Sequence, residues 1–306
     1  MKIACALLLA SALACPQETA RPRILGLSHV ALYVSDIAKA RKFYEDFLGY
    51  AEPFQLNKPD GQLSLAFVKI NDDQYVELFP GLAPENDRLS HISFFTDDAE
   101  AMRSYLAGQG VKVPDKVTKG RIGNLNFNVK DPDGHTVEFV QYMPDGWSLR
   151  DKGKFVGDAR ISGRMRHVGV LVGNLAAASR FYGEVLGFRE TWRGSSSGAV
   201  LSWVNMKVPE GDDYIEFMLY RDLPAADKRG TPHHICLEMP DLAQALKTLE
   251  ARPGGKDYNR PLEARVGTNR RRLANLFDPD GTRVELMEPT TVDGTPTPPS
   301  PAPPPR

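Results

Sequence analysis

Short apolar strands alternate with helical stretches along this chain, and the alternation repeats four times. Four segments open on a His and continue with mostly apolar positions, as buried or half-buried strands do. They are HVALYV at His29, HISFFT at His91, HVGVLV at His167 and HICLEM at His234. A helical pattern follows each strand, and then β-rich runs end in strands that contain Glu77, Glu138, Glu216 and Glu285. The predicted unit is therefore one strand, one helix and about three further strands.

Capping residues mark both ends of the predicted helices. Each helical stretch begins with Asp or Asn, whose side chain can accept a bond from free backbone N–H groups. A Gly near the C-terminal end closes the first three stretches. The stretches are DIAKARKFYEDFLG, DDAEAMRSYLAGQG, NLAAASRFYGEVLG and DLAQALKTLEA. The fourth ends instead at Arg252-Pro253-Gly254.

The two halves of the chain also match each other. FYEDFLGY at Phe43 resembles FYGEVLGF at Phe181, and DPDGHTVEF at Asp131 resembles DPDGTRVEL at Asp278. Together with the His-opening strands and the pair DQYVELF and DDYIEFM, these are four ordered matches, so we infer an internal duplication. One unit alone would expose an apolar sheet face, and pairing two units buries it. We predict an α+β fold with four βαβββ modules paired into two cup-shaped domains.

The repeat sets the expected boundaries. The segments that we expect are a leader at 1–22, a first domain at 25–145 with modules 27–84 and 88–145, a linker at 146–163, a second domain at 164–290 with modules 164–223 and 231–290, and a Pro-rich tail at 291–306. The tail is low in complexity, so we expect it to be extended, disordered and solvated.

The first residues resemble a secretion signal. Lys2 is followed by an apolar run, and Ala12-Leu13-Ala14 fits a cleavage site. We therefore expect a periplasmic or secreted protein. Cleavage before Cys15 would leave a thiol that can carry a lipid anchor. Only Cys236 lies in the body of the chain, so no disulfide framework is expected.

Composition narrows the class of function. The chain has 306 residues, with 38 Lys and Arg against 39 Asp and Glu. This balance argues against nucleic-acid binding, which needs a basic surplus. No uncharged apolar stretch is long enough to span a membrane. We expect a small-molecule substrate, and the oligomeric state stays open.

The repeated His and Glu positions carry the candidate chemistry. Imidazole nitrogens and carboxylate oxygens are ligands for divalent first-row metals. If paired modules curl into a cup, two His and two Glu meet at one point, twice in the chain. The predicted ligands are His29, Glu77, His91, Glu138, His167, Glu216, His234 and Glu285. The quartets can form within each half or between halves.

A structural alternative needs no metal. Each His is then a satisfied core residue, and each Glu pairs with an Arg. Eight positions in register across four modules favour the metal, because an unpaired carboxylate in an apolar strand is costly. His135, in the DPDG turn, is expected to be solvated. His233 is expected only to begin a strand.

These motifs resemble the vicinal oxygen chelate superfamily over about residues 25 to 289. That superfamily includes glyoxalase I, methylmalonyl-CoA epimerase, fosfomycin- and bleomycin-resistance proteins and type I extradiol dioxygenases. The resemblance implies cups of βαβββ modules. It also implies a metal that activates two neighbouring substrate oxygens and stabilises an enolate-like intermediate.

Glyoxalase I is the member that this chain resembles best in ligand count. The resemblance implies a lyase or isomerase that uses Zn, Ni, Co or Mn. Glu138 and Glu285 would be the catalytic bases, with Glu77 and Glu216 as partners. An exported protein works where glutathione is scarce, which argues for another small carbonyl or hydroxy-acid substrate. Arg271, in a run of three Arg, is a candidate anion-binding residue at the second site.

Two alternatives stay open. An Fe(II) ring-cleavage dioxygenase would use His167, His234 and Glu285, but the chain lacks a His between Cys236 and Glu285 that such enzymes use as an acid. A non-catalytic binding protein of the bleomycin-resistance kind would use the same cup, although such binders usually lack the metal ligands.

Overall fold

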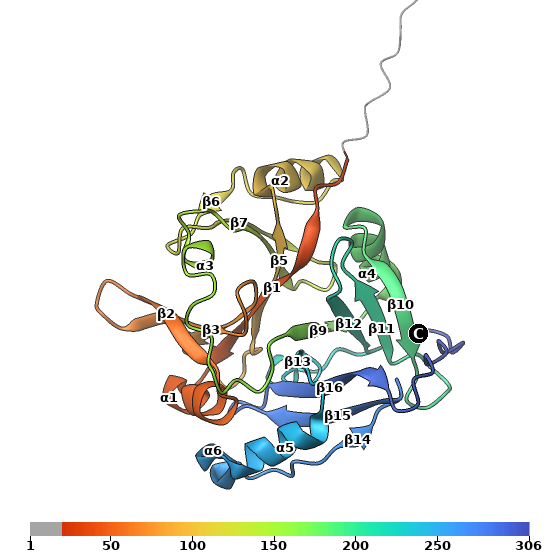
Figure 1. Cartoon of the computed structure of the whole chain (residues 1–306). Helices are drawn as coiled ribbons and strands as arrows, with labels where there is room; N and C mark the ends of the chain where they lie inside the picture. The colour runs from red at the N-terminus through yellow and green to blue at the C-terminus, as the bar shows by residue number, and fades with distance from the viewer. Residues whose placement is uncertain (1–19, 306) are drawn as a thin grey trace, which may run out of the picture.

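The chain folds into two curled sheets, one from each half (Figure 1). A computed structural model describes residues 20–305, and within them each sheet has eight strands. In order across the first sheet lie β2 (Ala51–Asn57), β3 (Leu63–Lys69), β4 (Tyr75–Pro80), β1 (Ile24–Val34), β5 (Leu89–Thr96), β8 (Thr136–Gln141), β7 (Leu125–Lys130) and β6 (Thr118–Lys119). Across the second lie β10 (Arg189–Gly194), β11 (Trp203–Lys207), β12 (Tyr214–Leu219), β9 (Met165–Val172), β13 (His234–Glu238), β16 (Arg283–Thr291), β15 (Arg271–Phe277) and β14 (Arg265–Val266).

Each module contributes its first strand, a helix and three more strands, so the predicted α+β fold of four βαβββ modules is confirmed. The helical segments are α1 (Ile37–Arg41) with a π-helical continuation (Lys42–Phe47), α2 (Ala99–Gly108), α3 (Trp147–Arg150), α4 (Leu175–Ala178) with a π-helical continuation (Ser179–Val185), a short 3-10 turn (Ala226–Lys228), α5 (Leu242–Ala251) and α6 (Pro253–Asp257). None of the helices in residues 20–305 is long and apolar enough to cross a membrane.

The predicted helix caps are present. The side chains that accept backbone N–H bonds at the starts of α1, α2, α4 and α5 are Asp36, Asp98, Asn174 and Asp241. Gly49, Gly110 and Gly187 follow the first three helices with φ of 80°, 78° and 75°. This left-handed conformation favours Gly, which lacks a Cβ.

The order of the strands decides how the modules pair. In each half, the first strands of its two modules lie antiparallel at the centre of the sheet, as β1 beside β5 and β9 beside β13. The last strand of each module lies parallel to the first strand of the same module, as β4 beside β1 and β8 beside β5. Both modules of one half therefore form one cup. The quartets of His and Glu thus form within each half and not between halves.

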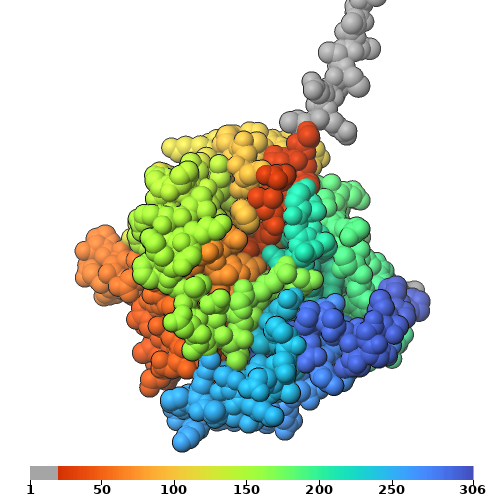
Figure 2. Space-filling model, viewed as in Figure 1, coloured from red at the N-terminus to blue at the C-terminus, as the bar shows by residue number. Residues whose placement is uncertain are grey.

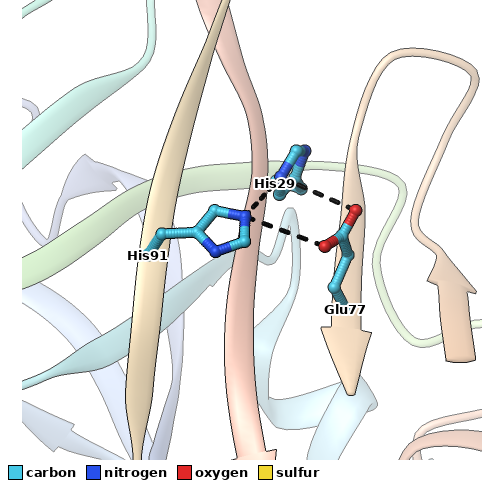
Figure 3. A group of neighbouring side chains, drawn as sticks. All are labelled: His29, Glu77 and His91. Atoms are coloured by element: carbon cyan, nitrogen blue, oxygen red, sulfur yellow. Dashed lines mark hydrogen bonds and ion pairs between the residues drawn. The ribbon is translucent and has the colours of Figure 1, made fainter. Parts of the chain in front are cut away.

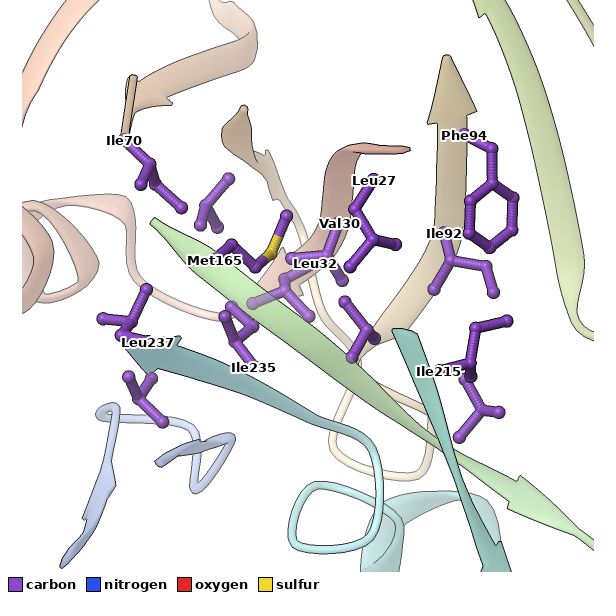
Figure 4. Close-up of a cluster of buried hydrophobic side chains, with 14 of the residues drawn as sticks. Leu27, Val30, Leu32, Ile70, Ile92, Phe94, Met165, Ile215, Ile235 and Leu237 are labelled. Carbon is purple, nitrogen blue, oxygen red and sulfur yellow. The ribbon is translucent and has the colours of Figure 1, made fainter. Parts of the chain in front are cut away.

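The core lies on the sheet faces that point away from the cups. Val30 and Leu32 of β1 alternate with His29 and Ala31, so they point to the opposite face. Val30 and Leu32 belong to the same buried cluster as Met165 of β9. Figure 4 shows these side chains together with others from the second half. The cluster runs through both halves, which pack side by side in Figure 2. The two halves therefore share one hydrophobic core.

The repeated motifs join the two halves through matching hydrogen bonds. The Tyr44 hydroxyl, from FYEDFLGY, donates to Asp278 of the second DPDG turn at 3.3 Å. The Tyr182 hydroxyl, from FYGEVLGF, donates to Asp131 of the first DPDG turn at 3.0 Å. All four residues are buried. In each half, the Tyr of the FY segment therefore binds the DPDG turn of the other half in the same way.

His135 is buried at this junction, so the expectation that it is solvated is wrong. It is 9% exposed, and its Nδ1 lies 2.8 Å from the Asp131 carboxylate. Its ring lies 5.1 Å from that of His233, which bonds Asp87 at 3.1 Å. The cause is the packing of the DPDG turn against the other half, which the local sequence does not reveal.

The two ends of the chain differ in what can be described. Residues 1–19 of the predicted leader, Cys15 included, lie outside the described residues. The tail is extended, but it is not solvated throughout as expected. The Leu201 N–H donates to the Pro303 carbonyl at 2.8 Å, and Ala302 is 8% exposed within the core cluster. The tail therefore packs on the second half.

Removing the two buried hydroxyls should weaken the junction. Tyr44→Phe and Tyr182→Phe each leave a buried carboxylate one donor short, so each should lower the free energy of unfolding by about 1 to 3 kcal/mol. Urea unfolding monitored by fluorescence measures the change. Tyr220→Phe is the control, because Tyr220 is 36% exposed. Equal effects from all three variants would contradict this account of the junction.

Candidate metal centres

The four predicted ligands of the first half converge on one point (Figure 3 shows three of them). They come from the four adjacent strands β4, β1, β5 and β8. The Nε2 atoms of His29 and His91 lie 3.0 Å apart. His29 Nε2 lies 3.4 Å from Glu138 and 3.6 Å from Glu77, and His91 Nε2 lies 3.8 Å from Glu77 and 3.9 Å from Glu138. Their role as metal ligands stays a prediction. The short distances between their nitrogen and oxygen atoms are what such a role requires.

A directional hydrogen-bond chain fixes the tautomer of His29. The Asp73 carbonyl can only accept, so the Tyr142 hydroxyl donates to it at 2.7 Å. Tyr142 has no second proton, so it accepts from Ser28 Oγ, also at 2.7 Å. Ser28 Oγ must then accept from His29 Nδ1 at 3.0 Å. The ring proton is therefore on Nδ1, and Nε2 presents a lone pair to the cluster, as a metal ligand does.

Burial keeps this cluster from holding charge by itself. Burial and the nearby Glu138 raise the pKa of Glu77 well above its usual range. Burial raises the pKa of Glu138 to about 7, although the Ser93 hydroxyl opposes the shift. Burial also lowers the pKa of His29 well below its usual value and that of His91 to about 4. Two neutral imidazoles and two carboxyls without a counter-charge fit a divalent cation.

A pocket of about 180 Å³ leads to all four side chains. Its wall combines apolar and polar side chains. The lining residues beyond the four ligands include Phe54, Leu56, Leu65, Phe67, Phe79, Ile122, Arg121, Asn124 and Asn126. A small molecule can therefore reach the point where a metal ion would be held.

The second half brings the corresponding four side chains together on β12, β9, β13 and β16. The Nε2 atoms of His167 and His234 lie 3.0 Å apart. His167 Nε2 lies 3.3 Å from Glu285, and His234 Nε2 lies 3.4 Å from Glu216. The two quartets therefore have nearly the same geometry.

Arg283 distinguishes the second half from the first. Its guanidinium nitrogen lies 2.6 Å from His234 Nδ1, and the side chain is buried. In the first half the matching position is Thr136, which bonds Lys130. The pocket at Glu216 and Glu285 is only about 60 Å³. His234 Nδ1 also lies 2.9 Å from the Pro232 carbonyl, so it has both a guanidinium and a carbonyl as neighbours.

The charge balance of the second quartet differs accordingly. Burial would raise the pKa of Glu285, but a hydrogen bond from His167 and the charge of Arg283 lower it overall. Burial likewise opposes ionisation of Glu216, and contacts with His234 and His167 lower its pKa. The pKa values of these two carboxyls are therefore shifted downward, whereas those of Glu77 and Glu138 are shifted upward.

Arg271 is not among the residues that line the pocket at Glu216 and Glu285. It lines a pocket of about 270 Å³ with Arg166, Lys207 and Tyr214, and the two pockets share Trp192 and Asn269. Its role in binding an anionic substrate stays a prediction.

Three functional candidates escaped the sequence patterns. Ser28 and Tyr142 hold His29, and Arg283 contacts His234. Ser28 directly precedes His29, and Arg283 lies two residues before Glu285 on the same strand face, so the sequence could have indicated both. The sequence does not indicate Tyr142, because its contact depends on the curl of the sheet.

Comparison with known proteins identifies the class. The family model of the Glyoxalase/Bleomycin resistance protein/Dioxygenase superfamily matches residues 26–139 and 164–286. These two regions cover most of the chain, so the protein belongs to this superfamily.

Relatives within the superfamily include lyases. Glyoxalase I of Saccharomyces cerevisiae is 23% identical over 312 residues, which cover 85% of this chain and 91% of that protein. A lactoylglutathione lyase of Neisseria meningitidis is 30% identical over 123 residues, which cover 38% of this chain and 89% of that protein.

Solved structures share the fold. The 2,3-dioxygenase LapB from Pseudomonas sp. KL28 has a TM-score of 0.65 at 17% identity, covering 90% of this chain and 97% of that one. A Mn(II)-bound glyoxalase from Novosphingobium aromaticivorans has a TM-score of 0.62 at 18% identity, covering 87% and 83%. At these identities the likeness is one of fold.

Breaking the hydrogen-bond chain should weaken metal binding without removing a ligand. Tyr142→Phe frees the Ser28 hydroxyl to donate to His29 Nδ1, which moves the ring proton to Nε2. We expect metal affinity to fall by about 10- to 100-fold. Calorimetric titration with Mn²⁺ or Zn²⁺ measures it. Tyr33→Phe is the control, since Tyr33 is 39% exposed. An unchanged metal affinity in Tyr142→Phe would show that Tyr142 does not determine the tautomer of His29.

Metal affinity in the first half should also depend on pH. Both carboxyls have raised pKa values without metal, so metal binding must displace their protons. Affinity should therefore rise as the pH increases through about 7, where Glu138 ionises. Titrations in buffers of different ionisation enthalpy would detect proton release. Binding without proton release at pH 7 would contradict these raised values.

Proposed function

We propose that the first half holds a divalent metal ion through His29, Glu77, His91 and Glu138, and that the protein is a glyoxalase-like lyase or isomerase. The observation that carries this proposal is an open pocket that leads to four converging ligand atoms. Neither Glu77 nor Glu138 forms an ion pair with an Arg or Lys among the described residues. The substrate is a small molecule with two neighbouring oxygens. When bound, the metal would supply a Lewis acid that polarises those oxygens.

Glu138 is the residue suited to move the proton. Its carboxylate lies at the point where the ligand atoms converge and is buried, so a substrate carbon held there would meet a base that water does not solvate. The Ser93 hydroxyl donates to its carboxylate at 3.1 Å and orients it. Glu138 takes the proton from the hydroxyl-bearing carbon beside a carbonyl and returns it to the former carbonyl carbon, while the hydroxyl proton passes to the other oxygen. The step is an isomerisation, so it needs no oxidant or reductant.

The pocket wall supports this chemistry. Phe54, Phe67 and Phe79 form an apolar side that limits the access of water to the reacting carbons. Arg121 lies at the same pocket and donates to the Asn57 carbonyl at 2.7 Å. Its charge suits a substrate that carries a carboxylate, such as a 2-hydroxy or 2-oxo acid derivative.

The ring-cleavage alternative has a weaker basis. Ligand atoms of His167, His234 and Glu285 lie within 4.8 Å of one another, as an iron site would need. The adjoining pocket of about 60 Å³ has little room for an aromatic diol, and Arg283 lines it. Assays with Fe(II) and catechols under oxygen test this alternative directly.

Export also belongs to this proposal. The apolar leader and the small residues before Cys15 support a periplasmic or secreted protein, with a lipid anchor if cleavage precedes Cys15. Such a location favours a substrate other than a glutathione adduct. Fractionation of cells that express the full chain tests it, and a chain retained whole in the cytoplasm would contradict it.

Removing the proposed base should stop turnover. The metal-stripped full chain is reloaded with Mn²⁺, Ni²⁺, Co²⁺ or Zn²⁺ and offered thiol adducts of 2-oxoaldehydes and 2-hydroxy carbonyl compounds in D₂O. NMR then follows exchange of the carbon-bound hydrogen. Glu138→Gln should lower the rate by about 10²- to 10⁴-fold, because the amide cannot accept the proton.

Glu85→Gln is the matched control, because Glu85 is an exposed carboxylate in the loop between β4 and β5. It should keep the rate of the unaltered chain. Full activity in Glu138→Gln, or turnover that persists without metal, would exclude the proposed mechanism. Metal binding with no turnover on any substrate of this class would favour the non-catalytic binding protein.

A further inference from the structure

The pocket of about 270 Å³ in the second half has a cationic lining. Its charged residues are Arg166 of β9, Lys207 of β11, Arg271 of β15 and Asp212. The Asp212 side chain is 66% exposed, so water weakens its charge. Arg166 lies 3.5 Å from Glu238, but its Nε atom is buried and has no partner in the part of the chain that the structure describes. The lining therefore has a surplus of positive charge.

Lys207 corresponds to Lys69 of the first half, because each lies opposite a Tyr on the next strand. Each lysine also pairs with an Asp of the loop that follows it. Lys69 is fully buried, and it donates to two carbonyl groups of the linker, those of Asp151 and Lys154, at 3.1 and 2.7 Å. Lys207 makes no such bonds, and its side chain is 30% exposed at the pocket.

Arg271 corresponds to Asn124 of the first half. The Gly120 N–H donates to the Asn124 carbonyl at 2.8 Å, and the Gly267 N–H donates to the Arg271 carbonyl at 2.9 Å, so the two turns match. The Asn124 amide donates to Ser148 of the linker at 3.2 Å. The Arg271 guanidinium forms no hydrogen bond or ion pair with any described residue. Its five N–H donors are therefore available to a ligand.

The linker thus fills, in the first half, the place that is a pocket in the second. The chain after β16 follows a different course. Thr297 of the tail donates to the Asn269 carbonyl at 2.6 Å, and Pro296 and Thr297 line the pocket. The tail forms part of the pocket wall, and the space between it and the cations stays open.

The wall of this pocket is also more polar than its counterpart. Phe54 lies opposite Phe67 in the first half, and Trp192 lies opposite Asn205 at the same place in the second. Trp192 Nε1 and Asn205 Oδ1 are buried, and neither has a hydrogen-bond partner among residues 20–305. Asn205 is only 8% exposed. Burying a polar atom without a partner is costly, so these two atoms point to a ligand that offers an acceptor and a donor.

We propose that this pocket binds a small organic anion that has at least two negative charges on oxygen and one hydroxyl group. Arg271 and Lys207 bind the charged oxygens, Trp192 donates to one of them, and Asn205 accepts from the hydroxyl. Hydroxy-dicarboxylates and phosphate esters of small polyols share this chemistry. The site needs no metal ion, so the inference goes beyond the proposed function and does not rest on it.

Calorimetric titration of the full chain tests the site. The protein is first stripped of metal on a chelating resin and is then titrated with malate or with glycerol phosphate. We expect about one anion per chain, with an affinity that falls as NaCl is added, because salt screens the charges. Binding of malate alone would assign a carboxylate ligand, and binding of glycerol phosphate alone would assign a phosphate ester. Uncharged glycerol should not bind, and binding of neither anion would overturn the inference.

Arg271→Asn copies the first half at this position. It should lower the affinity for the anion by about 10- to 100-fold, because charge-assisted hydrogen bonds are lost. Arg272→Asn is the matched control, since Arg272 lies on the same strand, its side chain is 57% exposed, and it does not line the pocket. The control should keep the affinity of the unaltered chain. An unchanged affinity in Arg271→Asn, or an equal loss in both variants, would overturn the inference.

Two further variants decide the matter if Arg271→Asn does not fold. Lys207→Met should lower the affinity by a similar factor. Binding should also change the fluorescence of the chain, because Trp192 lines the pocket. Trp192→Phe should remove that change, whereas Trp147→Phe, in the first half, should keep it. An anion that binds equally well to Lys207→Met, or a fluorescence change that persists in Trp192→Phe, would place the anion elsewhere and overturn the inference.

Discussion

Two buried carboxylates in each cup set the main constraint on this structure. A carboxylate removed from water must gain a cation, lose its charge or destabilise the fold. Glu77 and Glu138 form no ion pair with an Arg or Lys among the described residues, and burial raises the pKa of both. Glu216 and Glu285 have lowered pKa values, because of contacts with His167 and His234 and, for Glu285, the charge of Arg283. The same four ligand types therefore meet one electrostatic constraint in two different surroundings.

The motifs that repeat most clearly build the junction between halves. The Tyr of each FY segment reaches the DPDG turn of the other half, as Tyr44 does to Asp278 and Tyr182 to Asp131. Each DPDG turn leads directly into the strand that contains Glu138 or Glu285. A contact that fixes the turn therefore also fixes where the last ligand strand begins. The junction and the two cups are parts of one arrangement, supported by a core that both halves share.

The sequence could predict whatever depends on local pattern. Strand periodicity placed His29 and Glu77 on cup-facing positions, and capping residues such as Asp36 marked the helix starts. It left open whether quartets form within halves, since both pairings have the same local signals. The burial of His135 and the contact of Pro303 with Leu201 were not foreseen, because they depend on segments far apart in the chain. The tautomer of His29, which Tyr142 sets through Ser28, cannot be read from periodicity either.

A ligand pattern alone therefore counts sites, not bound ions. The alternative without a metal would pair each Glu with an Arg, but none of the four cup carboxylates forms an ion pair with an Arg or Lys among the described residues. Register reflects the shared backbone of the modules, which holds two His and two Glu at one point in each half. The two cups differ in the residue two positions before the last Glu, which is Thr136 in the first half and Arg283 in the second. They also differ in the residue opposite the second His, which is Ala31 in the first half and Gly169 in the second. The repeat therefore fixes where the ligand atoms meet, and the residues around them differ between the halves.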